Sequence, residues 1–130
     1  MRVLMTDSVS DDTSVERSLL NIAGINLVVT PSSCEQEIVA AGAGCLACIA
    51  PSASLTRAIL EALPDLKMLT SLGESLDHID LRAAKELGVW VTNVPGRSAT
   101  DSQDRRRAAI INVLSWLTHG TPTNVVVRGR

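Results

Sequence analysis

The chain has 130 residues, of which 45% are hydrophobic and 20% are charged, and its formal net charge is -2. This composition predicts one folded domain and argues against nucleic acid or an anionic membrane as the main partner. Apolar runs stay well short of the roughly 20 residues that span a bilayer, and the N-terminal segment turns polar too early for a signal peptide. We therefore expect a cytoplasmic protein.

Two kinds of segment alternate up to residue 93, short β-branched runs and longer amphipathic stretches, which is typical of a parallel sheet covered by helices. The predicted strands are residues 2–6, 25–30, 45–50, 67–71 and 90–93. The predicted helices between them are residues 14–23, 34–41, 55–63 and 81–87. These β–α units predict a flavodoxin-like, doubly wound α/β fold with a five-stranded parallel sheet in the order 2-1-3-4-5.

The ends of these helices are marked by residues with known capping preferences. Gly24 and Gly88 stand where two helices are expected to end, because glycine readily adopts the left-handed conformation that closes a helix. Ser54 is expected to cap the third helix and Pro64 to stop it, and Asp77 is expected to cap the fourth.

The pattern changes after Val94-Pro95-Gly96, where a polar stretch leads into one long helix from about residue 104 to residue 118. Gly120 ends this helix, and residues 122–127 are predicted to form an extended tail. The helix is expected to pack back on the sheet, because its apolar residues have helical spacing. They are Ile110, Val113, Leu114 and Leu117.

The segment from Gly42 to Ala47 matches the dinucleotide-binding pattern G-x-G-x-x-[GA]. That motif binds a pyrophosphate where it follows a strand and opens a helix, whereas here it follows a predicted helix and precedes a predicted strand. Cys45 and Cys48 have C-x-x-C spacing, but a redox pair begins a helix, and residues three apart on a strand point to opposite faces. We therefore expect no nucleotide site here and two buried strand cysteines.

The remaining chemically active side chains are few and dispersed. Cys34 makes the cysteine count odd, which predicts reduced thiols rather than a disulfide framework. His78 and His119 are too few to form a metal cluster with these thiols. The arginines from Arg105 to Arg107 spread around a helix, so we interpret them as a solvated face.

Three acidic residues, Asp7, Asp11 and Asp12, follow the first predicted strand at the edge where open α/β sheets bind ligands. A phospho-receiver site also needs an Asp after the third strand and a Lys after the fifth, where this chain has Ala50 and Asn93. An FMN site needs a glycine-containing phosphate loop here and aromatic rings for the flavin, and the chain has no Tyr or Phe. We interpret the acidic segment as a solvated loop with a helix cap.

One long stretch resembles the D-isomer-specific 2-hydroxyacid dehydrogenases. It joins Leu63-Pro-Asp-Leu-Lys67, a glycine loop, Asp77-His-Ile-Asp80, Ala83-Ala-Lys-Glu-Leu-Gly88 and Val91-Thr-Asn-Val-Pro-Gly96 in the order that the family has. The resemblance implies a flavodoxin-like substrate-binding domain. In the family a Rossmann domain, inserted within it, binds NAD or NADP and carries the catalytic Arg, Glu and His.

The chain departs from the family after Gly96. The segment Asn112-Val-Leu, followed by Pro122 and Asn124-Val-Val, resembles the family's C-terminus, which returns to the first domain after the insertion. The resemblance therefore implies that residues 1–96 and 97–130 are two pieces of one substrate-binding domain, with a junction near residues 96–99. Whether the inserted domain was removed by design or is naturally absent stays open.

For the site, the resemblance implies substrate binding without catalysis by this chain alone, because no residue here matches the family's catalytic Arg, Glu or His. Relatives hold the substrate carboxylate with backbone amides of a glycine loop, which correspond here to Gly73, Glu74 and Ser75. Ser52 belongs to a second wall. Glu74 brings a carboxylate beside the implied carboxylate site, which weakens this assignment or alters the substrate. No catalytic, metal or cofactor residue is assigned in this chain.

The expected partners are a small 2-keto or 2-hydroxy acid, bound weakly, the missing nucleotide-binding domain, and a second copy in a weak dimer through the uncovered cleft. Two alternatives stay open. The chain is a stand-alone flavodoxin-like binding or interaction module, or a residual enzyme that borrows a cofactor domain from another chain.

Overall fold

The computed structural model describes residues 2–6, 14–30, 34–50, 53–72, 75–94, 102–122 and 124–129. Six strands are found there, and they form one sheet. They are β1 (Arg2–Met5), β2 (Asn26–Val29), β3 (Ala47–Ile49), β4 (Met68–Thr70), β5 (Trp90–Thr92) and β6 (Val125–Val127). The helices between them are α1 (Ser14–Ile22), α2 (Glu35–Gly42), α3 (Arg57–Ala62), α4 (Leu81–Leu87) and α5 (Ser102–His119).

The strand order is β2-β1-β3-β4-β5-β6, so the predicted order of the first five strands is confirmed, as is their parallel pairing. The prediction of a five-stranded sheet is wrong, because β6 pairs with β5 in the antiparallel direction. Its three valines favour an extended backbone at a sheet edge. Arg128, just past β6, places its guanidinium carbon 5.7 Å from the centre of the Trp90 ring, which fastens the tail against β5.

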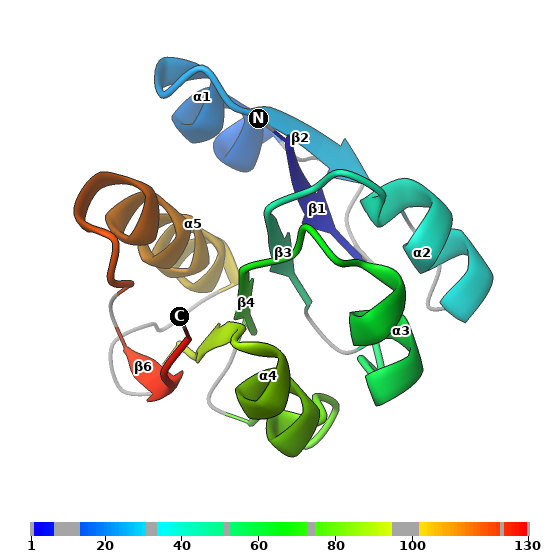
Figure 1. Ribbon diagram of the computed structural model, residues 1–130. Coiled ribbons are helices and arrows are strands. Elements are labelled where there is room, and N and C mark those ends of the chain that lie inside the picture. The colour runs from blue at the N-terminus through cyan, green and yellow to red at the C-terminus, as the bar shows by residue number, and fades with distance from the viewer. Residues whose placement is uncertain are drawn as a thin grey trace.

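The two faces of the sheet are covered by different helices (Figure 1). One face is packed by α2, α3 and α4, which contribute Ile38, Ile59 and Ala84 to its buried cluster. The other face is packed by α1 and α5, and its cluster joins Leu20 of α1 to Ile110 of α5. The C-terminal segment therefore shares a hydrophobic core with the strands that precede it.

The observed helix ends confirm some capping predictions and correct others. Gly24 and Gly88 have φ angles of 73° and 74°, the left-handed conformation expected where α1 and α4 end. The Thr56 hydroxyl, rather than Ser54, caps α3 by accepting a hydrogen bond from Ile59 N–H. Asp80, rather than Asp77, caps α4. Helix α3 begins later than predicted, so its cap moves with it, whereas α4 begins at Leu81 as predicted and is capped by the residue directly before it.

Helix α5 buries a different face from the one that its apolar spacing predicts. Ile110 and Val113 are fully buried as expected, but Leu114 and Leu117 are only half-buried. Ala109 and the polar Asn112 are fully buried in their place. The helix is rotated toward these smaller residues because it packs on both the sheet and α1. No described helix combines the length and apolarity needed to cross a membrane.

Candidate functional site

The carboxyl ends of the parallel strands meet at one edge of the sheet, where folds of this class bind ligands. Backbone hydrogen bonds continue the sheet past these ends. Thr6 N–H donates to Ile49 C=O at 3.0 Å, and Ala50 N–H donates to Thr70 C=O at 2.8 Å. Thr6, Ala50 and Ser71 are all fully buried. The edge is therefore a rigid platform from which the connections to α3 and α4 leave.

The predicted substrate residues belong to these two connections. Ser52, Gly73 and Glu74 lie outside the described residues, as do Asp7, Asp11 and Asp12, so their assignments stay predictions. Ser75 is described and exposed, and its hydroxyl accepts a hydrogen bond from Asp77 N–H at 3.4 Å. Its side chain thus closes a local turn.

The described parts of the two connections are bonded to each other. Leu55 and Ile79 form an isolated parallel bridge, in which Leu55 N–H donates to His78 C=O at 2.8 Å and Asp80 N–H donates to Leu55 C=O at 3.0 Å. The ring of His78 reaches back to the end of β3, where Nε2 lies 2.9 Å from Ala50 C=O. The sequence alone predicted no role for His78.

A shallow pocket of about 270 Å³ lies over this bridge. Its lining mixes hydroxyl, imidazole and carboxylate groups with two aliphatic side chains. The residues are Ser54, Leu55, Thr56, Asp77, His78, Ile79 and Asp80. Asp80 and Thr56 cap the two helices. Asp80 Oδ1 accepts a hydrogen bond from Ala83 N–H at 3.0 Å, and Thr56 Oγ1 accepts one from Ile59 N–H at 3.4 Å. Within the described ranges, no three His, Cys, Asp or Glu side chains gather as a metal site.

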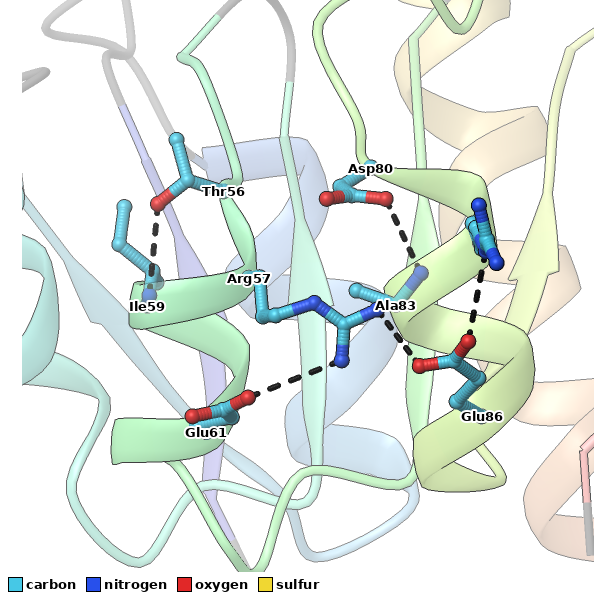
Figure 2. A network of polar contacts seen from close by, with 8 residues as sticks. Thr56, Arg57, Ile59, Glu61, Asp80, Ala83 and Glu86 are labelled. Carbon is cyan, nitrogen blue, oxygen red and sulfur yellow. Dashed lines mark hydrogen bonds and ion pairs between the residues drawn. The ribbon is translucent and has the colours of Figure 1, made fainter.

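Below the caps, an exposed ion network joins α3 to α4 (Figure 2). The Arg57 guanidinium donates to Glu86 Oε2 at 2.6 Å and also lies 3.7 Å from Glu61. Arg82 approaches the other oxygen of Glu86 at 3.4 Å. The hydrogen bond to Glu86 raises the pKa of Arg57 above its ordinary value, so the guanidinium stays charged. We call these four residues the Arg57 network.

On the other face of the sheet, a buried amide joins the C-terminal segment to the strand ends. Asn112 Nδ2 donates to Thr70 Oγ1 at 3.2 Å and to Asn93 C=O at 3.0 Å. Asn112 Oδ1 accepts from Asn124 Nδ2 at 3.1 Å, and Asn93 N–H donates to Asn124 C=O at 3.3 Å. Both amide hydrogens and the amide oxygen of Asn112 are thus satisfied. We call Thr70, Asn93, Asn112 and Asn124 the Asn112 network.

The glycines that imitate a nucleotide fingerprint have packing roles. Gly42 ends α2, and a Cβ placed on it would lie 3.0 Å from the Leu4 side chain and 3.1 Å from that of Leu63. Gly44 has a φ of 80° and lies against Arg2. Because the segment leads out of a helix into β3, helix N-terminal amides are not available to a pyrophosphate. The residues present do not fit a dinucleotide at this position.

The cysteine pair is buried, as predicted, but the two residues do not face opposite sides. Cys45 lies before β3 begins, so strand alternation does not reach it, and both side chains belong to the cluster under α2, α3 and α4. All three cysteines are free thiols. Burial raises the pKa of the Cys45 thiol above its ordinary value, and Arg2 offsets part of this rise. A redox-active thiol needs the opposite shift.

Sequence reasoning missed the residues that hold the strand ends together. Asn112 could have been noticed in the sequence, because it is a polar residue beside the apolar positions of α5. Whether its side chain points into the core, however, depends on how α5 packs. The sequence around His78 gave no such indication, because the partner of its ring is a main-chain carbonyl, and side-chain patterns do not reveal main-chain partners.

The family described as "D-isomer specific 2-hydroxyacid dehydrogenase, catalytic domain" matches residues 3–127, so the chain belongs to this family. The Thermotoga maritima hydroxypyruvate reductase is 47% identical over 45 residues, which are 35% of this chain and 15% of that protein.

Solved structures resemble the fold over most of the chain. The NAD-bound 3-phosphoglycerate dehydrogenase of Entamoeba histolytica has a TM-score of 0.68 at 22% identity, covering 75% of this chain and 34% of that chain. The D-lactate dehydrogenase of Escherichia coli has a TM-score of 0.64 at 25% identity, covering 74% of this chain and 31% of that chain. The chain therefore corresponds to about a third of each of these dehydrogenases.

Proposed function

We propose that this chain is the substrate-binding domain of a D-2-hydroxyacid dehydrogenase, lacking the inserted nucleotide-binding domain. Residues 1–96 form its N-terminal part, residues 97–130 form its returning helix and tail, and the junction lies near residues 96–99. The family match extends from residue 3 to residue 127 and so includes both parts, while the chain covers about a third of the solved relatives. That combination is the observation that carries the proposal.

The Asn112 network supports the assignment of the two parts. Asn112 and Asn124 belong to the C-terminal part, and they bond to Thr70 and Asn93 of the N-terminal part. Asn112 and Thr70 are fully buried, and buried polar groups require hydrogen-bond partners. Within the described residues, the two proposed parts thus share hydrogen bonds and a hydrophobic cluster, which supports their assignment to one domain.

The chemistry expected of this chain is anion binding. Backbone N–H groups of residues 73–75 are proposed to hold the carboxylate of a 2-keto or 2-hydroxy acid, and Ser52 to line the opposite wall. Adjacent backbone amides bind anions whatever the side chains are. Glu74 opposes this binding by charge, so we expect weak affinity.

Hydride transfer is not expected of the chain alone. The nicotinamide of NAD or NADP would supply the hydride, with an Arg to polarise the keto group and a His–Glu pair to exchange the proton. The family places these residues in the inserted domain. The Gly42–Ala47 segment does not fit a dinucleotide, so this chain's proposed contribution is to bind and orient the acid.

The test is an NADH titration of the purified chain, followed by Trp90 and Trp116 fluorescence, and then addition of pyruvate, glyoxylate or hydroxypyruvate. We expect a folded chain by circular dichroism, no saturable NADH binding and no NADH oxidation. Saturable binding or turnover would contradict the proposal and favour a residual enzyme.

A second arm adds the separately produced nucleotide-binding domain of a related dehydrogenase. Keto-acid-dependent NADH oxidation that appears only in the mixture would identify the chain as a substrate domain. The absence of both keto-acid binding and complementation would favour a stand-alone interaction module.

A weak homodimer, formed through the face that a cofactor domain would cover, stays a prediction. Sedimentation velocity over about a hundredfold range of protein concentration tests it, because self-association is concentration-dependent. A single monomeric species throughout would contradict it.

A further inference from the structure

We propose that His78 is a positioning residue, which fastens the connection leaving β3 to the connection leaving β4, the two connections to which the proposed substrate residues belong. This inference rests on the proposed function, because it assigns the substrate to these two connections.

His78 contacts the β3–α3 connection through two polar contacts. Its ring Nε2 lies 2.9 Å from the carbonyl oxygen of Ala50, the first residue after β3. Its own carbonyl accepts from Leu55 N–H at 2.8 Å, five residues further along. Ser52, the residue proposed to face the substrate, stands between these points in the sequence. One residue of the β4–α4 connection thus bonds to residues on both sides of Ser52 in the sequence.

The donor and acceptor roles in the ring contact are set by chemistry. A backbone carbonyl only accepts hydrogen bonds, so the Nε2 atom of His78 carries the hydrogen. Ala50 is fully buried, and its N–H already donates to Thr70 at 2.8 Å. The carbonyl is therefore anchored in the sheet, and the ring ties the β4–α4 connection to this fixed point.

The neighbouring contacts differ from the ring contact in one useful respect. The Leu55–Ile79 bridge is made by main-chain atoms and persists through side-chain substitution. The caps at Thr56 and Asp80 fix the helices that follow. The ring contact with Ala50, by contrast, is one that a substitution of His78 can remove while leaving the bridge in place.

Three substitutions of His78 distinguish the effect of its hydrogen bond from the effect of its side-chain volume. His78→Gln keeps an N–H donor near the position of Nε2, whereas His78→Asn places its amide near the position of Nδ1 and falls short of Ala50. His78→Ala removes the donor altogether. His119→Ala is the matched control, because His119 is exposed at the end of α5 on the other face of the sheet.

The experiment titrates each full-length variant with oxamate, an unreactive analogue of a 2-keto acid, and follows backbone amide shifts by NMR. Unfolding curves establish a temperature at which every variant is folded. We expect His78→Gln and His119→Ala to bind oxamate like the original chain. His78→Ala and His78→Asn should bind about fivefold more weakly, which corresponds to the loss of one hydrogen bond. Equal affinities for all variants would overturn the inference.

Amide hydrogen exchange at Leu55 and Asp80 distinguishes failure of this inference from failure of the proposed function. Both amides donate across the bridge, and we expect them to exchange faster in His78→Ala than in His78→Gln. If the original chain does not bind oxamate, the proposed substrate site is wrong, whatever the exchange rates are. If it binds oxamate but neither affinity nor exchange responds to His78→Ala, the positioning role alone is wrong.

Discussion

The Asn112 network and the Arg57 network both join segments that are distant in the sequence, yet they differ in their exposure to water. Asn112 is fully buried and bonds to Thr70, 42 positions earlier. Arg57 bonds to Glu86, 29 positions later, and the two side chains are 41% and 50% exposed. The Asn112 network consists of neutral groups around a buried amide, and the Arg57 network consists of full charges on the surface.

This difference decides how much each network matters for stability. Removing one partner of a buried hydrogen bond leaves the other desolvated and unpaired, which costs about 1 to 3 kcal/mol. An exposed ion pair exchanges its partner for water with little loss, and salt screens it further. The short 2.6 Å contact in the Arg57 network is therefore a poor guide to its importance.

The largest effect is expected from Asn112→Ala. This change leaves the Asn93 carbonyl and the Thr70 hydroxyl without their donor and opens a small cavity beneath α5. We expect the free energy of unfolding to fall by about 3 kcal/mol in urea denaturation. Thr118→Ala, an exposed substitution on the same helix, is the control. A loss no greater than that of the control would show that the network is dispensable.

A smaller effect is expected at Asn124, where backbone and side chain can be tested separately. Asn124 has a φ of 57°, a left-handed conformation that glycine adopts freely and alanine does not. Asn124→Gly should cost about 1 kcal/mol for the lost bond to Asn112, and Asn124→Ala about 2 kcal/mol because strain is added. Equal losses in thermal unfolding would contradict the role of the backbone.

The helix caps are intermediate between the two networks, because they are only partly buried. Asp80→Ala should lower the free energy of unfolding by about 1 kcal/mol, and Asp80→Asn by less, since an amide oxygen still caps. Thr56→Ala should cost less than Asp80→Ala, because its bond to Ile59 N–H is longer, 3.4 Å against 3.0 Å. The reverse order in matched denaturation curves would contradict this ranking.

The smallest effect is expected from Arg57→Gln, which removes the charge that both Glu61 and Glu86 share. The midpoint of urea denaturation should shift slightly at low salt and not measurably at high salt, because the pairs are exposed. Arg82→Gln, which leaves the Arg57 contacts intact, serves as the matched control. A large loss that persists at high salt would place the Arg57 network with the buried contacts.

The strand and helix segments were predictable because they rest on local patterns. All ten elements predicted before the tail are present, with ends that differ by a few residues. Alternation, helical spacing and glycine punctuation reflect backbone preferences and burial within a single segment. The tail is different, because Val125–Val127 became a sixth strand only by meeting the edge of β5.

The site was predictable only in outline. Its location at the carboxyl ends of the strands follows from the fold class, and the family resemblance named Ser52, Gly73, Glu74 and Ser75. The contact between His78 and Ala50 depends on the main chain of a neighbouring unit. A pattern of side chains contains no information about which carbonyl lies within reach of a ring.

By itself, then, the sequence determined the family, the alternation of strands and helices, and the parallel order of the first five strands. Tertiary structure decided that Asn112 faces inward, that Cys45 and Cys48 share one cluster, and that the tail pairs antiparallel with β5. The physical reason is that conformational preferences act over a few residues, whereas burial and hydrogen-bond partners depend on segments that meet only in the folded chain.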